Sequence, residues 1–88
     1  MSLYQIVRRV IGEKEVALDE ASDSDNTAGW DSLKNMELIF AVESTYRVRF
    51  TVKEVVRLKN IGDLRRLLLA KGADVELIEP VREELLRA

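Results

Sequence analysis

The sequence predicts an all-α protein, a small four-helix bundle with a long first loop, a short third helix and an extra C-terminal helix. Its 88 residues suit one small domain with a modest core. Apolar residues make up 47% of the chain and charged residues 34%, with one Pro and four Gly, a composition typical of a helix-rich globular protein. Apolar residues recur at helical spacing in several stretches, and no stretch forms a convincing strand.

The first helix is expected between two residues that favour helix ends. Ser2 can cap it and Gly12 can stop it, and its apolar positions are Leu3, Ile6, Val7, Val10 and Ile11. Residues 13–31 are polar, with the Ser, Asp, Asn and Gly density of a loop. Because this connection is long for a small domain, apolar side chains are expected to anchor it to the core: Val16, Ala17, Leu18 and Trp30.

The second and third helices also follow capping residues. Asp31 can cap a second helix that runs from Ser32 to about Tyr46. The sequence TVKE, residues 51–54, has the pattern of a capping box. It is expected to open a short third helix through Val52, Val55 and Val56.

A fourth helix is expected from residue 61 to residue 70, capped by Asn60 and followed by Gly72. Its Leu64, Leu67 and Leu68 share one face. Residues 1–72 therefore form the predicted domain. Residues 73–88 form an extension, in which Pro80 suits the first turn of a fifth helix that runs to about Arg87. Its apolar residues are expected to pack back on the bundle, with a dimer or docking surface as the alternative: Val75, Leu77, Ile78, Val81, Leu85 and Leu86.

The second helix carries apolar residues on two faces. On a helical wheel, one stripe is wide enough to pack on the other helices and consists of Leu38, Ile39, Val42 and Tyr46. A second stripe lies well away from the first, begins beside Ser32, has Glu43 on its near edge and Glu37 on its far edge, and consists of Leu33, Met36 and Phe40. In one interpretation the loop or the extra helix covers this second stripe. In the other it stays exposed as a surface for partners.

The composition excludes several classes of function. The chain has no Cys and no His, which rules out disulfides, the usual Cys-His and Ser-His-Asp nucleophile systems and most zinc sites. We therefore expect no self-contained hydrolase, no catalytic residues and no metal site. The N-terminus does not have the pattern of a signal peptide, and the longest purely aliphatic run, LLLA, is far too short to span a membrane. A cytoplasmic protein is expected.

The net charge of −2 is distributed unevenly along the chain. Residues 1–31 carry a net charge of −4, residues 32–72 carry +5 and residues 73–88 carry −3. The basic residues of the middle segment are scattered, with no aromatic or Gly-rich recognition motif among them. Nucleic-acid binding is therefore not expected.

Ser32 is the candidate site of chemistry, at the first helical position after Asp31. A serine at a helix start is often only a capping or turn residue. Since the chain has no His to activate the hydroxyl, any reaction at Ser32 needs a base, and a metal, supplied by another enzyme. The positive end of the helix favours an anion there. A phosphorylated serine and a phosphopantetheinylated serine both fit this position.

The residues around Ser32 carry a family resemblance. The tripeptide DSL, residues 31–33, opens a helix after a long loop and is followed by ELIFAVESTYRVRF and then by IGDLRRLL. Over roughly residues 3–72 the chain resembles the acyl carrier protein family, of the discrete bacterial type. The resemblance implies that Ser32 carries 4′-phosphopantetheine, with Asp31 and Leu33 flanking it. A separate Mg²⁺-dependent phosphopantetheinyl transferase attaches this arm from coenzyme A.

The resemblance also implies that the chain is a tether rather than an enzyme, and it implies a set of partners. The arm ends in a thiol that holds an acyl or aminoacyl group as a thioester near whichever enzyme docks. The implied partners are an acyl- or aminoacyl-loading enzyme and a downstream transferase or synthase, acting on a monomeric carrier. The implied partner-binding residues lie on the second helix: Leu33, Met36, Glu37, Phe40 and Glu43.

The chain departs from the family pattern in its charge. Typical fatty-acid carriers are strongly acidic along the second and third helices, whereas this chain has four basic residues there, Lys34, Lys53, Arg57 and Lys59. Partners that dock through basic patches would lose electrostatic steering. We therefore expect a dedicated biosynthetic pathway rather than general fatty-acid synthesis. The alternative is an unmodified helical interaction module with the same fold.

Overall fold

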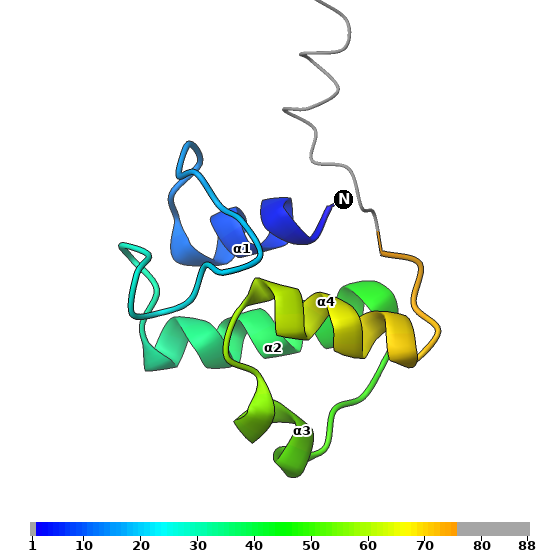
Figure 1. The fold of residues 1–88 in the computed structure, drawn as a ribbon. Helices are drawn as coiled ribbons and strands as arrows, with labels where there is room; N and C mark the ends of the chain where they lie inside the picture. Colours follow the sequence, from blue (N-terminus) through cyan, green and yellow to red (C-terminus); the bar gives the residue numbers. More distant parts are fainter. Residues whose placement is uncertain (1, 76–88) are drawn as a thin grey trace, which may run out of the picture.

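The computed structural model describes residues 2–75, and these residues contain four helices and no strand. The helices are α1 (Leu3–Ile11), α2 (Ser32–Tyr46), α3 (Val52–Arg57) and α4 (Ile61–Ala70). In Figure 1, α1 and the short α3 lie on opposite sides of the central α2 and α4. The all-helical prediction and the bounds of the first four helices are confirmed. The predicted fifth helix and the packing of residues 76–88 fall outside the described residues.

All four helices begin at the capping residues that the sequence predicts. In α1, the Ser2 hydroxyl accepts a hydrogen bond from the Gln5 amide at 3.2 Å, while the Gln5 side chain accepts one from the Ser2 amide at 2.8 Å. Thr51 and Glu54 form the same reciprocal capping box at the start of α3. Gly12 ends α1 in the left-handed conformation, with φ of +77°, which a residue without Cβ adopts at little cost.

The core lies between α1, α2 and α4. The three long helices supply most of its buried apolar residues, joined by Trp30 from the loop and Val75 after α4: Leu3, Tyr4, Ile6, Val7, Ile11, Leu38, Val42, Ile61, Leu64 and Leu68. Ile39 is also buried, and Tyr46 packs against this cluster from the end of α2. The predicted core face of α2 is therefore confirmed. In contrast, α3 has no buried residue, and its Val52 and Val56 are 79% and 72% exposed.

The long loop between α1 and α2 is anchored as predicted, except at one residue. Val16, Leu18 and Trp30 pack against the core, whereas Ala17 is exposed. The prediction for Ala17 was wrong, and its single methyl group offers less apolar area to bury than the side chains of its two neighbours.

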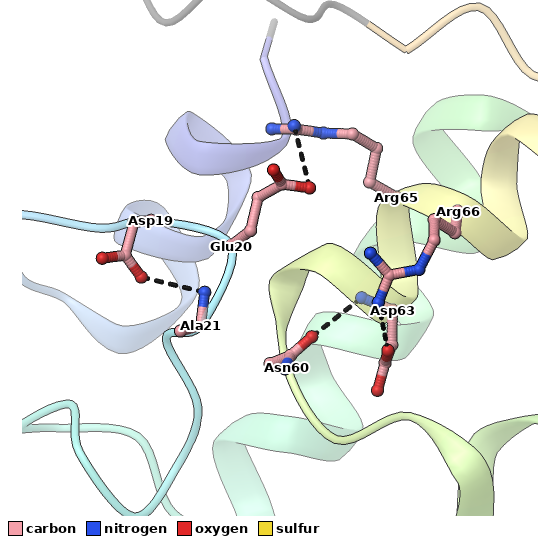
Figure 2. Close-up of polar contacts among 7 residues, drawn as sticks. All are labelled: Asp19, Glu20, Ala21, Asn60, Asp63, Arg65 and Arg66. Atoms are coloured by element: carbon pink, nitrogen blue, oxygen red, sulfur yellow. Dashed lines mark hydrogen bonds and ion pairs between the residues drawn. The ribbon is translucent and has the colours of Figure 1, made fainter.

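The same loop closes over the start of α4. The backbone carbonyl groups of Ser22 and Glu20 accept hydrogen bonds from the amides of Ile61, at 3.1 Å, and Gly62, at 2.9 Å. These bonds satisfy two of the amides that have no partner within the helix. The Glu20 carboxylate also forms an ion pair with buried Arg65 at 3.3 Å, as Figure 2 shows. The loop is therefore tied to the bundle at both its apolar anchors and its polar contacts.

Candidate functional site

Ser32 is the first residue of α2, and its side chain is exposed. Among residues 2–75, no group forms a hydrogen bond with its hydroxyl. The neighbouring Asp31 serves as the cap, because its carboxylate accepts a hydrogen bond from the Lys34 amide at 2.8 Å. The Asp31 carbonyl group accepts another from the Asn35 amide, also at 2.8 Å. Asp31 therefore fixes the start of the helix and leaves the Ser32 hydroxyl accessible to another protein.

The chain just before Ser32 is held in place by a buried aromatic residue. Trp30 is only 7% exposed, and its indole nitrogen donates a hydrogen bond to the Asn35 side chain at 3.2 Å. Gly29, one residue earlier, has φ of +84°, and a Cβ atom there would lie 3.2 Å from the carbonyl oxygen of Ile11. The sequence singled out Trp30 as an anchor, but no sequence signal singled out Asn35 as its partner.

A cavity of about 300 Å³ lies directly beside Ser32. Its apolar walls come from α2, from the α3–α4 connection and from α4, and include Met36, Ile39, Leu58 and Leu64. The rest of the lining includes Lys59 from the α3–α4 connection. No pattern in the sequence predicts this cavity, because it forms between segments that are far apart along the chain.

The second apolar stripe of α2 is exposed. Leu33 is 67% exposed, Met36 45% and Phe40 62%. The loop of residues 13–31 therefore leaves these side chains open to solvent. Glu37 beside them is also exposed and forms an ion pair with Lys34 at 3.4 Å. Glu43 is half-buried, and its carboxylate accepts a hydrogen bond from the Phe50 amide at 2.9 Å, an intramolecular contact that the sequence did not predict.

The electrostatics around Ser32 favour an anion. The amides of Ser32 and Leu33 donate no hydrogen bond to any group of residues 2–75. They add to the partial positive charge at the start of α2. The chain has no His or Cys, and among the described residues there is no cluster of three or more acidic side chains that is suited to a metal ion. The site therefore presents a hydroxyl and an anion-tolerant helix end, without a base of its own.

Two carboxyl groups with shifted titration lie elsewhere, at the starts of α3 and α4. The hydrogen bond from the Thr51 amide, followed by the contacts with Lys71, lowers the pKa of Glu54. The hydrogen bond from the Lys59 amide, followed by that from Arg66, lowers the pKa of Asp63. Both groups serve as structural contacts at helix ends. Neither belongs to the surroundings of Ser32.

Comparisons with known proteins agree with this geometry. The family model described as "Phosphopantetheine attachment site" matches residues 2–68. Among solved structures, the solution NMR structure of holo acyl carrier protein from Geobacter metallireducens is similar, with a TM-score of 0.71 and 34% sequence identity. The alignment covers 80% of this chain and 84% of that one. No curated protein matches the chain significantly.

These comparisons establish the family of the helical bundle in which Ser32 begins α2. The family match spans the four described helices almost completely. The solved structure shares the all-helical fold at substantial sequence identity. No helix of residues 2–75 has the length and apolar character needed to cross a membrane. The chain belongs to the family of phosphopantetheine attachment domains, to which acyl carrier proteins belong, and is a carrier rather than an enzyme.

Proposed function

We propose that this carrier holds an acyl or aminoacyl group as a thioester on a 4′-phosphopantetheine arm attached to Ser32, and presents it to the enzymes of a dedicated biosynthetic pathway. The observation that carries the proposal is the exposed Ser32 hydroxyl at the first position of α2, in a chain of the phosphopantetheine attachment family. When bound, the arm supplies a flexible thiol that forms the thioester.

The attachment step needs both this chain and a transferase. The Ser32 oxygen forms a bond to the phosphorus of coenzyme A that bears the pantetheine, the bond from that phosphorus to the departing adenosine bisphosphate breaks, and the serine proton passes to a base. Because this chain has no His or Cys, the transferase supplies that base and the Mg²⁺. This chain contributes the exposed hydroxyl, and the start of α2 favours the negative charge of the resulting phosphodiester.

Two features near Ser32 support a carrier role. The cavity of about 300 Å³ beside the serine has apolar side chains from α2 and α4 in its lining, which suit contact with an acyl chain. The exposed second stripe of α2, Leu33, Met36 and Phe40, provides an apolar surface next to the attachment point. We assign this stripe, with Glu37 and Glu43 at its edges, to the docking of the transferase, the loading enzyme and a downstream transferase or synthase.

The assignment to a dedicated pathway rests on charge. Residues 32–72 carry a net charge of +5, so this carrier would repel a partner whose docking surface is basic. A pathway with its own loading enzyme and few clients accommodates such a carrier.

Intact-mass spectrometry after incubation with coenzyme A and a broad-specificity phosphopantetheinyl transferase tests the proposal. We expect the mass to increase by one phosphopantetheinyl group in the wild-type chain and to stay unchanged in Ser32→Ala. Ser44→Ala is the matched control, because Ser44 is also an exposed serine of α2 and should not affect the modification. An unmodified wild-type chain with several transferases would instead support the helical interaction module.

A further inference from the structure

The acidic and basic side chains of residues 32–72 differ in whether they have a partner within the chain. Each acidic side chain has a partner within the chain: Glu37 pairs with Lys34, Glu43 accepts from the Phe50 amide, Glu54 pairs with Lys71, and Asp63 pairs with Arg66. Arg65 pairs with Glu20 of the loop. Five cationic side chains remain exposed and form no ion pair within residues 2–75, namely Arg47, Arg49, Lys53, Arg57 and Lys59. The net positive charge of this segment is thus concentrated in these five residues.

Three of the five unpaired cations lie at the two ends of the exposed stripe on α2. Lys59 lines the cavity that also contains Ser32 and Met36, so it marks the end of the stripe near the attachment point. At the other end, Arg47 and Arg49 line a shallow surface hollow together with Phe40 and Glu43. Two cations and one carboxylate leave this hollow with a net positive charge. The apolar stripe is therefore bounded by positive charge at each end.

The remaining two unpaired cations lie on α3, beside exposed valines. Val52 and Val56 are four residues apart, and so are Lys53 and Arg57, which places the two pairs in adjacent rows along the helix. All four side chains are exposed. This face of α3 therefore repeats the arrangement on α2, in which apolar side chains lie next to unpaired positive charge.

We propose that the partner enzyme docks on this surface through an acidic surface of its own. The docking surface consists of the α2 stripe and the exposed face of α3, together with the five unpaired cations. This inference rests on the proposed carrier function and specifies the chemistry of the partner. Because the cations have no internal partner, an acidic protein pairs with them without displacing an existing ion pair. The apolar side chains supply contact area, and the cations steer the encounter.

The mixed chemistry of the surface favours an acidic protein over the other anionic occupants. A nucleic-acid backbone would pair with the cations but would leave the exposed Leu33, Phe40 and Val52 without an apolar partner. The acidic extension of this chain and the acidic loop of a second copy are the remaining candidates. A carrier needs this face open beside Ser32 in order to deliver its arm, which argues against permanent coverage by either of them.

The test uses one phosphopantetheinyl transferase in two forms, the natural enzyme with a basic docking surface and a version in which that surface is reversed to acidic. We compare the modification rates of the wild-type chain and Lys53→Glu/Arg57→Glu with both enzymes. For each enzyme, we divide the kcat/KM of the variant by that of the wild-type chain, which cancels the intrinsic activity of the enzyme. The double variant is expected to lower kcat/KM roughly tenfold with the acidic transferase and to raise it with the basic one. The preference of the wild-type chain for the acidic transferase over the basic one should weaken as the salt concentration increases.

A matched control and a neutral variant accompany this comparison. Arg9→Glu/Lys14→Glu reverses two exposed cations that line one hollow at the end of α1. Because α1 and α3 lie on opposite sides of α2 and α4 (Figure 1), this variant should have the kcat/KM of the wild-type chain with each enzyme. Lys53→Gln/Arg57→Gln should give intermediate ratios, and it preserves the test if the charge reversal unfolds the chain. If both α3 variants had the kcat/KM of the wild-type chain with each enzyme, the inference would be overturned.

A binding measurement separates this inference from the proposed function. It uses the Ser32→Ala chain, which cannot be modified at position 32, and titrates it with the acidic and the basic transferase. If no transferase modifies the wild-type chain, the carrier proposal fails, yet NMR shifts of the amides of residues 47–59 still report whether the acidic transferase binds more tightly than the basic one. Equal affinity would overturn the inference. It would also be overturned if removal of residues 76–88 or dilution of the protein alone produced the same shifts, because the extension or a second copy would then be the occupant.

Discussion

The two apolar faces of α2 predict opposite consequences for truncations that lie only two residues apart. Leu38 is 2% exposed, so Leu38→Ala should lower the free energy of unfolding by about 2–5 kcal/mol through lost burial and the resulting cavity. For a domain of this size, this corresponds to a decrease in Tm of at least about 8 °C. Phe40 is 62% exposed, so Phe40→Ala should change the free energy of unfolding by no more than about 0.5 kcal/mol.

The rate of Ser32 modification should respond in the opposite way, with Phe40→Ala having the larger effect and Leu38→Ala the smaller one. If Phe40 anchors the partner, its truncation should slow modification of Ser32 by about fivefold or more, the effect of losing over 1 kcal/mol at a docking surface. Leu38→Ala should leave the rate near the wild-type value at a temperature where the variant is fully folded. Urea unfolding followed by circular dichroism measures stability, and intact-mass time courses with coenzyme A measure the modification rate.

Two results would refute this reasoning. A loss of 2 kcal/mol or more in Phe40→Ala would show that Phe40 contributes to the core, contrary to its exposure. Wild-type modification rates in both Phe40→Ala and Met36→Ala would show that the exposed stripe does not take part in docking the transferase. Since the first result concerns stability and the second concerns binding, each is decided independently.

Two further predictions concern stability. The lowered pKa values of Glu54 and Asp63 mean that their stabilising contribution is complete above the ordinary pKa of a carboxyl group and is lost as the pH falls through the lowered values. Thermal unfolding across this acid range should therefore show a decreasing Tm, with a shallower slope in Glu54→Gln/Asp63→Asn, and equal slopes would contradict the assignment. Gly29→Ala should destabilise more than Gly12→Ala in urea unfolding, because both have positive φ, which disfavours Ala by roughly 1 kcal/mol, but only at Gly29 is the added Cβ crowded, by Ile11. Equal losses would show that the backbone relaxes around the added methyl group.

Local chemistry accounts for the parts of the fold that the sequence predicted correctly. Each helix start depends on a capping side chain within three residues of the amide that it binds, as with Asp31 and the amide of Lys34. The core face of α2 follows from helical periodicity alone, which places Leu38 and Val42 on one side. These signals are short-range, so a single sequence contains them.

The features that the sequence could not supply depend on contacts between distant segments. The loop of residues 13–31 closes over α4 through backbone carbonyl groups, which every residue has, so no residue type marks Glu20 or Ser22 as the acceptor. The cavity beside Ser32 likewise needs α2 and the α3–α4 connection to be brought together. Asn35 is an unremarkable polar residue until the fold places the indole of Trp30 against it.

The charge of the candidate docking surface shows the same division between composition and structure. The sequence gives the net charge of +5 for residues 32–72, but a net charge does not distinguish five unpaired cations from a larger number of partly paired groups. The fold makes this distinction by giving a partner to every acidic side chain of the segment, including Glu43, whose carboxylate binds the Phe50 amide. The Phe50 amide holds the Glu43 carboxylate in place beside the stripe, but no cation of residues 2–75 forms an ion pair with it. An unpaired charge acts on a partner at longer range than a paired one, so the character of this surface is set by Arg47, Arg49, Lys53, Arg57 and Lys59.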